Sequence, residues 1–355
     1  MKTIVLTGGG TAGHVTPNVA IIPLLKKEGF KIHYIGTDGI EKKLISEIPD
    51  VEYHTITSGK LRRYFDLKNI SDPFKVLKGI SQSSKLLKKI KPDVVFSKGG
   101  YVAVPVVLAA KMRKVPTVIH ESDITPGLAT KLSAGAAKKI CVTFEAAGKN
   151  FDASRVVVTG SPIRPELFTG DAERARRALS FDNKPVVLFM GGSMGAKVIN
   201  DTMRKVLGEL TQGYNIIHIC GKGNLEPELE GNSYKQFEYV SAELCDYMAL
   251  ADMVVSRAGS NSINEFLALA KPMLLIPLSV NASRGDQVDN AEDFKKHGYC
   301  NVLIQEDMTT DTLIQAIENT FNNREVYKRN MSQSKASNGA KNVLDTIIEV
   351  VNGAK

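Results

Sequence analysis

Short apolar runs alternate with longer amphipathic stretches through the first 160 residues of the chain. Runs rich in Val, Ile and Thr are typical of buried strands, whereas apolar residues recurring every three or four positions are typical of helices. The predicted strands are residues 3–7, 31–35, 52–56, 94–97, 117–120 and 139–142, and the predicted helices are residues 15–27, 74–90, 103–112 and 127–134. Because strands and helices alternate, we predict a parallel sheet with helices on both faces.

The same alternation starts again after Pro185. Here the predicted strands are residues 186–190, 215–220, 253–256, 273–276 and 301–304, and the predicted helices include residues 196–210, 310–321, 324–333 and 340–351. One glycine and two prolines at residues 160–165 separate the two halves and predict a hinge. We therefore predict an α/β protein with two Rossmann-like, doubly wound parallel-sheet domains facing across a cleft, at residues 1–161 and 162–340.

Both halves open with a strand, a glycine-rich turn and a helix. The first turn is GGGTAGH at residues 8–14, the second is GGSMGA at residues 191–196, and a third helix opens with RAGSNSINE at residues 257–265. Glycines let a ligand approach the backbone, and a helix N-terminus attracts phosphate. The turns therefore predict a phosphorylated ligand. The first turn by itself also fits an NAD enzyme, with Asp38 as the acid that would bind the ribose.

His14 directly follows the first glycine turn. The positive end of the helix dipole disfavours an imidazolium there, so we expect a neutral ring near pH 7. Such a ring can accept a proton from an attacking hydroxyl, or it can simply orient the loop or a phosphate. Glu265 has two interpretations as well, because one turn into a helix it can bind ribose hydroxyls or stabilise the helix dipole.

The formal charge of +8 and the pI of about 9.1 indicate an acidic partner. Nucleic acid is disfavoured because the chain has no Trp and no interleaved aromatic and basic residues. Ten basic residues lie between Lys60 and Lys91, opposed only by Asp66 and Asp72. This amphipathic segment predicts contact with an anionic membrane, worth roughly 1 kcal/mol per basic residue near the surface. The alternative is an ordinary helix with a solvated lysine face.

No residue spacing predicts a metal or a cofactor. Cys141, Cys220, Cys245 and Cys300 are scattered and are expected to act as small apolar residues. Glu121 and Asp123 lack a ligand partner at useful spacing, and no Asp-x-Asp occurs. The apolar runs fall short of the roughly 20 residues that a membrane span needs. The N-terminal residues lack the features of a signal peptide, so we expect a cytoplasmic protein.

Seven motifs together resemble the MurG family, the undecaprenyl-linked N-acetylglucosaminyltransferases of peptidoglycan synthesis. They occur in family order over essentially the whole chain, at residues 8–14, 97–102, 120–123, 160–164, 191–195, 257–265 and 284–290. The resemblance implies a GT-B fold, with the last helix, residues 341–355, packed on the first domain. It also implies metal-independent, inverting transfer of N-acetylglucosamine (GlcNAc) from UDP-GlcNAc to the C4 hydroxyl of the muramoyl sugar in lipid I. The product would be lipid II, made at the cytoplasmic face of the cell membrane by a peripheral protein.

The resemblance also implies roles for individual residues. His14 would be the catalytic base, and the loop at residues 8–13 would hold the lipid diphosphate. Glu265 would bind the ribose, and the backbone at Val240 the uracil. The implied donor-binding residues are Thr11, Gly13, Asp123, Arg164, Ser193, Val240, Ser260, Asn261, Ser262, Glu265, Asp286 and Gln287. The implied acceptor-binding residues are Gly9, Gly10, Tyr101, His120 and Glu121. Further proteins of cell-wall synthesis are implied as partners.

The chain departs from the family pattern at two positions. Many members have Asn where this chain has Asp123, and Gln where it has Asp286. A carboxylate cannot donate a hydrogen bond, so contacts to the sugar would change, and either carboxylate is an alternative base. The competing functions are a lipid glucosyltransferase of related fold, a UDP-sugar epimerase, an NAD oxidoreductase and a non-catalytic lipid-diphosphate binder.

Overall fold

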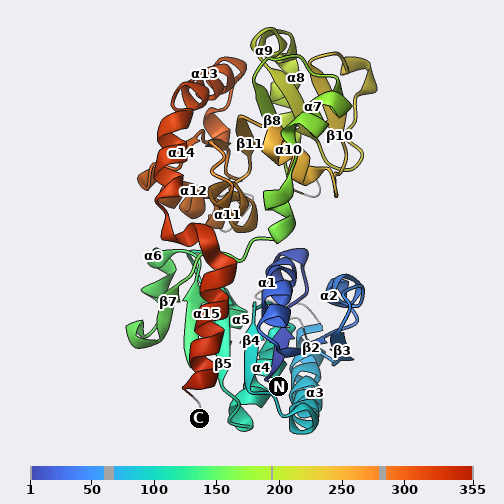
Figure 1. Cartoon of the computed structure of the whole chain (residues 1–355), viewed down its shortest axis with the longest axis vertical. Helices are drawn as coiled ribbons and strands as arrows, with labels where there is room; N and C mark the ends of the chain where they lie inside the picture. The colour runs from blue at the N-terminus through green and yellow to red at the C-terminus, as the bar shows by residue number, and fades with distance from the viewer. Residues whose placement is uncertain (1, 60–67, 193–194, 280–284, 354–355) are drawn as a thin grey trace. The chain divides into compact units, whose positions relative to one another are not determined.

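The structure, a computed structural model, describes residues 2–59, 68–192, 195–279 and 285–353 (Figure 1). The chain forms two units, the first from Met1–Arg164 together with Asn338–Lys355, and the second from Pro165–Ser337. Each unit contains one parallel sheet with helices on both faces. The prediction of two Rossmann-like domains of the GT-B type is confirmed.

The sheet of the first unit has seven parallel strands in the order β3-β2-β1-β4-β5-β6-β7. The strands are β1 (Thr3–Thr7), β2 (Lys31–Gly36), β3 (Val51–Thr55), β4 (Val94–Ser97), β5 (Thr117–Glu121), β6 (Lys139–Val142) and β7 (Val156–Val158). The helices are α1 (Thr16–Lys27), α2 (Ile40–Ile45), α3 (Lys68–Ile90), α4 (Ala103–Met112), α5 (Leu128–Ala134), α6 (Glu145–Gly148) and α15 (Gly339–Asn352). A single 3-10 turn, Ala12–His14, precedes α1.

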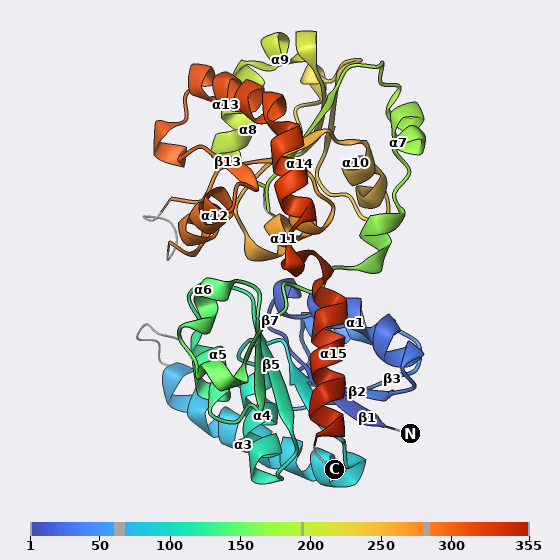
Figure 2. The same cartoon turned by 60° about the vertical axis from the view of Figure 1, so that its left-hand side comes forward.

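Two hydrophobic layers hold this sheet. On one face α1 and the C-terminal helix α15 pack side by side, and Val343, Ile347 and Val350 of α15 are buried among Ile4 and other strand residues (Figure 2). On the opposite face α3 and α4 cover the sheet through residues such as Leu87. The C-terminal helix therefore completes the core of the first unit.

The second unit repeats this arrangement with six parallel strands in the order β10-β9-β8-β11-β12-β13. The strands are β8 (Val186–Met190), β9 (Asn215–Ile219), β10 (Tyr234–Phe237), β11 (Met253–Ser256), β12 (Met273–Leu275) and β13 (Cys300–Val302). The helices are α7 (Ala172–Leu179), α8 (Lys197–Lys205), α9 (Leu207–Gly213), α10 (Leu244–Leu250), α11 (Ser260–Ala268), α12 (Asp286–Lys296), α13 (Thr310–Asn322) and α14 (Arg324–Ser332). Helices α8 and α13 contribute to the core on one face of the sheet.

Some predicted elements differ from the observed ones. The helix predicted at residues 196–210 is two helices, because the chain leaves helical geometry at Val206. A β-branched residue there, with Gly208 two positions on, explains the weak point. The edge strands β7 and β10 were not predicted, since they are short and are held by pairing with β6 and β9. Within the described ranges, every helix is too short or too polar to cross a bilayer.

Candidate active site

Four of the predicted motifs follow the strands at which the strand order of each sheet reverses. In a doubly wound sheet, the loops after the two central strands diverge and leave a crevice at the carboxyl ends of the strands. In the first unit these strands are β1 and β4, followed by residues 8–14 and 98–102. In the second unit they are β8 and β11, followed by residues 191–196 and 257–259. Each unit therefore has a candidate ligand site at its own switch point.

In the first unit, two glycine loops interlock around His14. Gly10 has φ of +86°, and a Cβ there would lie 2.3 Å from the Tyr101 ring. Gly100 has φ of +79°, and a Cβ there would lie 2.2 Å from the carbonyl oxygen of Gly9 and 3.0 Å from the His14 ring. These positions require glycine both for the backbone conformation and for the close approach. The packing of the two loops fixes the place of the His14 ring.

The His14 ring has a defined tautomer. Its Nδ1 lies 3.3 Å from the carbonyl oxygen of Lys98, which can only accept, so Nδ1 carries the proton and Nε2 has the lone pair. Burial lowers the pKa of His14, and the Lys98 ammonium adds to the shift against the opposing effect of Glu121. A neutral imidazole with Nε2 unprotonated is the form that a general base needs at neutral pH.

A buried lysine lies behind His14. The Lys98 side chain is 1% exposed, and its Nζ donates to Nδ1 of His120 at 3.0 Å and to the Ser122 hydroxyl. Burial lowers the pKa of Lys98 to about 8, although Glu121 and Asp123 oppose the shift. Burial and the nearby Lys98 charge also hold the pKa of His120 well below its usual value. His120 is therefore neutral and donates from Nε2 to the carbonyl oxygen of Gly160 at 2.9 Å.

Glu121 organises the loop that follows β5. Its carboxylate accepts hydrogen bonds from the backbone N–H groups of Ser122 at 2.8 Å, Asp123 at 3.0 Å and Gly127 at 3.2 Å. Like His120, it is almost fully buried and has protein partners at its polar atoms. Of the five implied acceptor-binding residues, Glu121 therefore supports the loop that carries Asp123, and His120 contacts Lys98 and Gly160.

The carboxylate that reaches the first glycine loop is Glu41 of α2. It accepts from the N–H of Gly10 at 3.1 Å and from the N–H of Thr37 at 3.0 Å, and its side chain is fully buried. The NAD interpretation used Asp38 instead, but Asp38 pairs with Lys42 at the surface. The acidic residue at this glycine loop is therefore Glu41 and not Asp38, the residue that the NAD interpretation requires.

The second unit contains a cavity of about 500 Å³ at its switch point. Three helices begin beside it, α8 after Ala196, α11 after Gly259 and α12 after Gly285. The N-cap residues Ala196, Gly259 and Gly285 have no polar side chain, and each helix N-terminus carries the positive end of the helix dipole. Residues 191, 192, 195–198, 256, 257, 259, 262, 278, 287 and 305 line the cavity. The arrangement suits a diphosphate.

Fixed polar side chains line the same cavity. The Arg257 guanidinium donates to the carbonyl oxygens of Ile276 at 3.1 Å and Pro277 at 3.2 Å and to Oε1 of Gln305 at 2.6 Å. Burial lowers the pKa of Arg257, which remains charged at neutral pH. The Oε1 atom of Gln287 accepts from the N–H of Leu278 at 2.9 Å, so the other end of this amide is the donor. The cavity thus combines positive charge with an oriented amide.

The remaining implied residues divide between the units. In the first unit, Thr11 and Gly13 lie on the glycine loop. Arg164 is the last residue of this unit before the chain enters the second unit. In the second unit, Ser262 and Gln287 line the cavity. Ser260, Asn261 and Glu265 lie on α11, Asp286 begins α12, and Val240 is buried after β10. Ser193 lies outside the described residues.

Several residues that the structure brings to these sites had no predicted role. Glu41 and Lys98 contact the loops around His14, and Arg257 and Gln305 line the cavity of the second unit. Lys98 had one local signal, since a lysine directly after a buried strand and before two glycines is unusual for a surface residue. Glu41 had none, because its partner lies 31 positions away.

Comparison with known proteins agrees with this geometry. The chain matches the glycosyltransferase family 28 N-terminal domain at residues 4–142 and the family 28 C-terminal domain at residues 186–347. A Clostridium tetani protein is 54% identical over 349 residues, covering 98% of this chain and 97% of that protein. It is named UDP-N-acetylglucosamine--N-acetylmuramyl-(pentapeptide) pyrophosphoryl-undecaprenol N-acetylglucosamine transferase. The chain belongs to the MurG family. Like the family's other members, it is a glycosyltransferase.

Solved structures extend the comparison. The MurG of Acinetobacter baumannii superposes with a TM-score of 0.78 at 25% identity, covering 98% of this chain and all of that one. A UDP-GlcNAc 2-epimerase from Neisseria meningitidis superposes with a TM-score of 0.69 at 15% identity, covering 98% of this chain and all of that one. The epimerase shares the fold alone, whereas membership of the MurG family rests on sequence along nearly the full length.

Proposed function

We propose that this protein transfers GlcNAc from UDP-GlcNAc to the C4 hydroxyl of the muramoyl sugar of lipid I and so forms lipid II. The observation that carries the proposal is the neutral His14 ring with its Nε2 lone pair, held between two glycine loops. The relatives' printed names supply the donor and the acceptor. A base, a hydroxyl acceptor and a diphosphate leaving group are what such a transfer needs.

The reaction is a single displacement. His14 Nε2 takes the proton of the acceptor hydroxyl as its oxygen forms a bond to the anomeric carbon of GlcNAc. The bond from that carbon to the diphosphate oxygen breaks on the opposite face, and UDP leaves with the electron pair. Attack opposite the leaving group inverts the anomeric configuration. Lys98 is a positioning residue here, since its carbonyl oxygen holds Nδ1 of His14.

The second unit would hold the donor. Negative charge develops on the UDP leaving group, and the ends of α8, α11 and α12 with the Arg257 guanidinium supply positive potential in the cavity. These groups can take the role that a divalent metal plays beside other nucleotide diphosphates, so we propose metal-independent transfer. Glu265 would bind the ribose, and Gln287 with Asp286 would bind the sugar hydroxyls.

We also propose that the first unit contacts the cytoplasmic face of the membrane through the segment between Lys60 and Lys91. Residues 60–67 of this segment fall outside the described residues. Within α3, Phe74 is 71% exposed and Leu77 is 62% exposed, and Lys75 and Lys78 stand beside them. Exposed apolar side chains flanked by lysines suit the interface of an anionic bilayer.

The test is transfer of labelled GlcNAc from UDP-GlcNAc to a short-chain lipid I analogue in the presence of EDTA. We expect transfer by wild type and almost none by His14→Ala, which should still bind UDP. Glu265→Gln should instead weaken UDP binding, measured by calorimetry. Wild type that binds UDP and leaves the lipid I analogue unchanged would contradict the acceptor assignment. Transfer that EDTA abolishes would contradict metal independence.

A further inference from the structure

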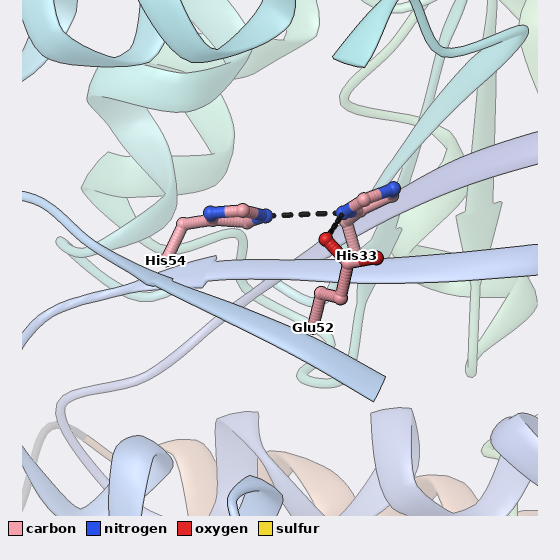
Figure 3. A group of neighbouring side chains, drawn as sticks. All are labelled: His33, Glu52 and His54. Carbon is pink, nitrogen blue, oxygen red and sulfur yellow. Dashed lines mark hydrogen bonds and ion pairs between the residues drawn. The ribbon is translucent and has the colours of Figure 1, made fainter. Parts of the chain in front are cut away.

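Three potential metal ligands project from the edge of the first sheet. His33 belongs to β2, and Glu52 and His54 belong to β3, the edge strand of this sheet (Figure 3). The parallel register pairs His33 with Glu52 and Ile35 with His54. Because side chains alternate along a strand, the three ligand residues share one face of the sheet. It is the face covered by α3, opposite to the one where Tyr34 packs against α1 and α15.

The ligand atoms converge. His33 Nδ1 lies 3.0 Å from Nε2 of His54 and 3.3 Å from Oε2 of Glu52, and both lines meet at His33 (Figure 3). All three ligand atoms lie within 4.8 Å of one another. Tetrahedral Zn²⁺ with bonds of about 2.0–2.2 Å requires neighbouring ligand atoms about 3.3 Å apart. Two of the three separations therefore lie close to those of a zinc site, and the third is no more than 4.8 Å.

Zinc would replace a hydrogen bond between the two histidines. In the structure, one of the two ring nitrogens donates to the other across 3.0 Å, so metal binding must release that proton or move it to another ring nitrogen. Lys31 binds Oε1 of Glu52 at 2.8 Å and leaves Oε2 toward the histidines. Such a contact orients a metal-binding carboxylate in the manner of an outer-shell partner.

We propose that His33, Glu52 and His54 bind one Zn²⁺ ion, with water at the fourth position. Two imidazoles and one carboxylate favour zinc over magnesium, which prefers oxygen ligands. The ion would join β3 to β2 and so fasten the exposed edge of the sheet. The site is separate from the transfer chemistry, because its residues lie on β2 and β3 and not on the loops around His14. The positive charges of Lys31 and Lys89, which oppose protonation of His54, also limit the affinity for a cation.

The test is calorimetric titration of the full-length, EDTA-stripped and dialysed protein with ZnCl₂ and, separately, with MgCl₂. We expect one equivalent of zinc to bind and to raise the thermal unfolding midpoint. Magnesium should neither bind nor change this midpoint. Co²⁺ should give the visible absorption of a tetrahedral site. A wild-type protein that binds no zinc would overturn the proposal.

Substitutions of the proposed ligand residues test whether zinc binds at this site. Glu52→Gln keeps the size of the side chain and should weaken zinc binding at least tenfold, and His54→Ala should do the same. His297→Ala is the matched control, because His297 is an exposed histidine beside Asp293 in the second unit. Cys245→Ser removes a partly exposed thiol. Circular dichroism checks that each variant is folded. Unchanged zinc affinity in Glu52→Gln, or loss of binding only in a control variant, would place the metal elsewhere.

Discussion

At the scale of single residues, the environment of His14 decides the chemistry. The ring donates from Nδ1 to the carbonyl oxygen of a residue 84 positions away, which leaves Nε2 as the basic atom. The same residue, Lys98, places a positive charge nearby that helps to lower the pKa of His14. One residue therefore fixes both the tautomer and the charge state of the proposed base.

This arrangement predicts a pH dependence. Since the pKa of His14 is below its usual value, the acid limb of the kcat/KM profile for GlcNAc transfer should lie below pH 6.5. Lys98→Met removes a positive charge that opposes protonation of His14, so the limb should move to higher pH. The backbone contact to Nδ1 remains in this variant. A limb that stays in place in Lys98→Met would show that Lys98 does not tune this histidine.

The glycine loops give a second prediction at this scale. Gly100 and Gly29 have similar positive φ values, +79° and +75°. A Cβ at Gly100 would clash with the carbonyl oxygen of Gly9, whereas a Cβ at Gly29 would have no neighbouring atom within 4 Å among the described residues. Gly29→Ala should cost about 1 kcal/mol of unfolding free energy through backbone strain alone. Gly100→Ala should cost more in urea denaturation and should also lower transfer, because the loop beside His14 must shift. Equal effects of the two variants would contradict the close packing.

At the scale of elements, α3 divides into two parts. Leu87 is 2% exposed and packs on the sheet, whereas Phe74 and Leu77 near the start of the helix are exposed. The helical pattern in the sequence placed all three on one apolar side. The first turns of α3 extend past the part of the helix that packs on the sheet. The same apolar side of the helix is therefore buried near Leu87 and exposed at Phe74 and Leu77.

The exposed part of α3 predicts membrane binding. Phe74→Ser combined with Leu77→Ser should weaken binding to vesicles that contain phosphatidylglycerol roughly tenfold or more, since burying one such side chain is worth about 1.5–3 kcal/mol. Sedimentation with the vesicles measures this. Phe168→Ser is the control, because Phe168 is 55% exposed in the second unit. High salt should weaken the binding of wild type. If the double variant and the control sediment alike, α3 is not the membrane contact.

At the scale of the whole molecule, α15 makes the two ends of the chain interdependent. It follows the second unit in sequence but lies in the core of the first, with Ile347 fully buried. The first unit therefore cannot complete its core until the last 15 or so residues are present. The cleft between the domains and the hinge at residues 160–165 stay predictions.

This dependence is testable by substitution. Ile347→Ala should lower the free energy of unfolding by about 2–5 kcal/mol, because it leaves a cavity between α15 and the sheet. Ile40→Ala, at a helical residue that is 43% exposed, should change it by less than about 1 kcal/mol. Urea denaturation followed by circular dichroism compares them. Similar values for the two variants would mean that α15 adds little to the first unit.

Most strands and helices of both halves, the glycine turns and the family were predictable from the sequence. These depend on residues close together in the chain, where periodicity and turn chemistry act. The tautomer of His14, the burial of Lys98 against His120 and the approach of Glu41 to Gly10 depend instead on the tertiary structure. It also brought His33 and His54 together from two strands. Such contacts follow from the order in which strands pair, because that order places residues side by side that are distant in the chain.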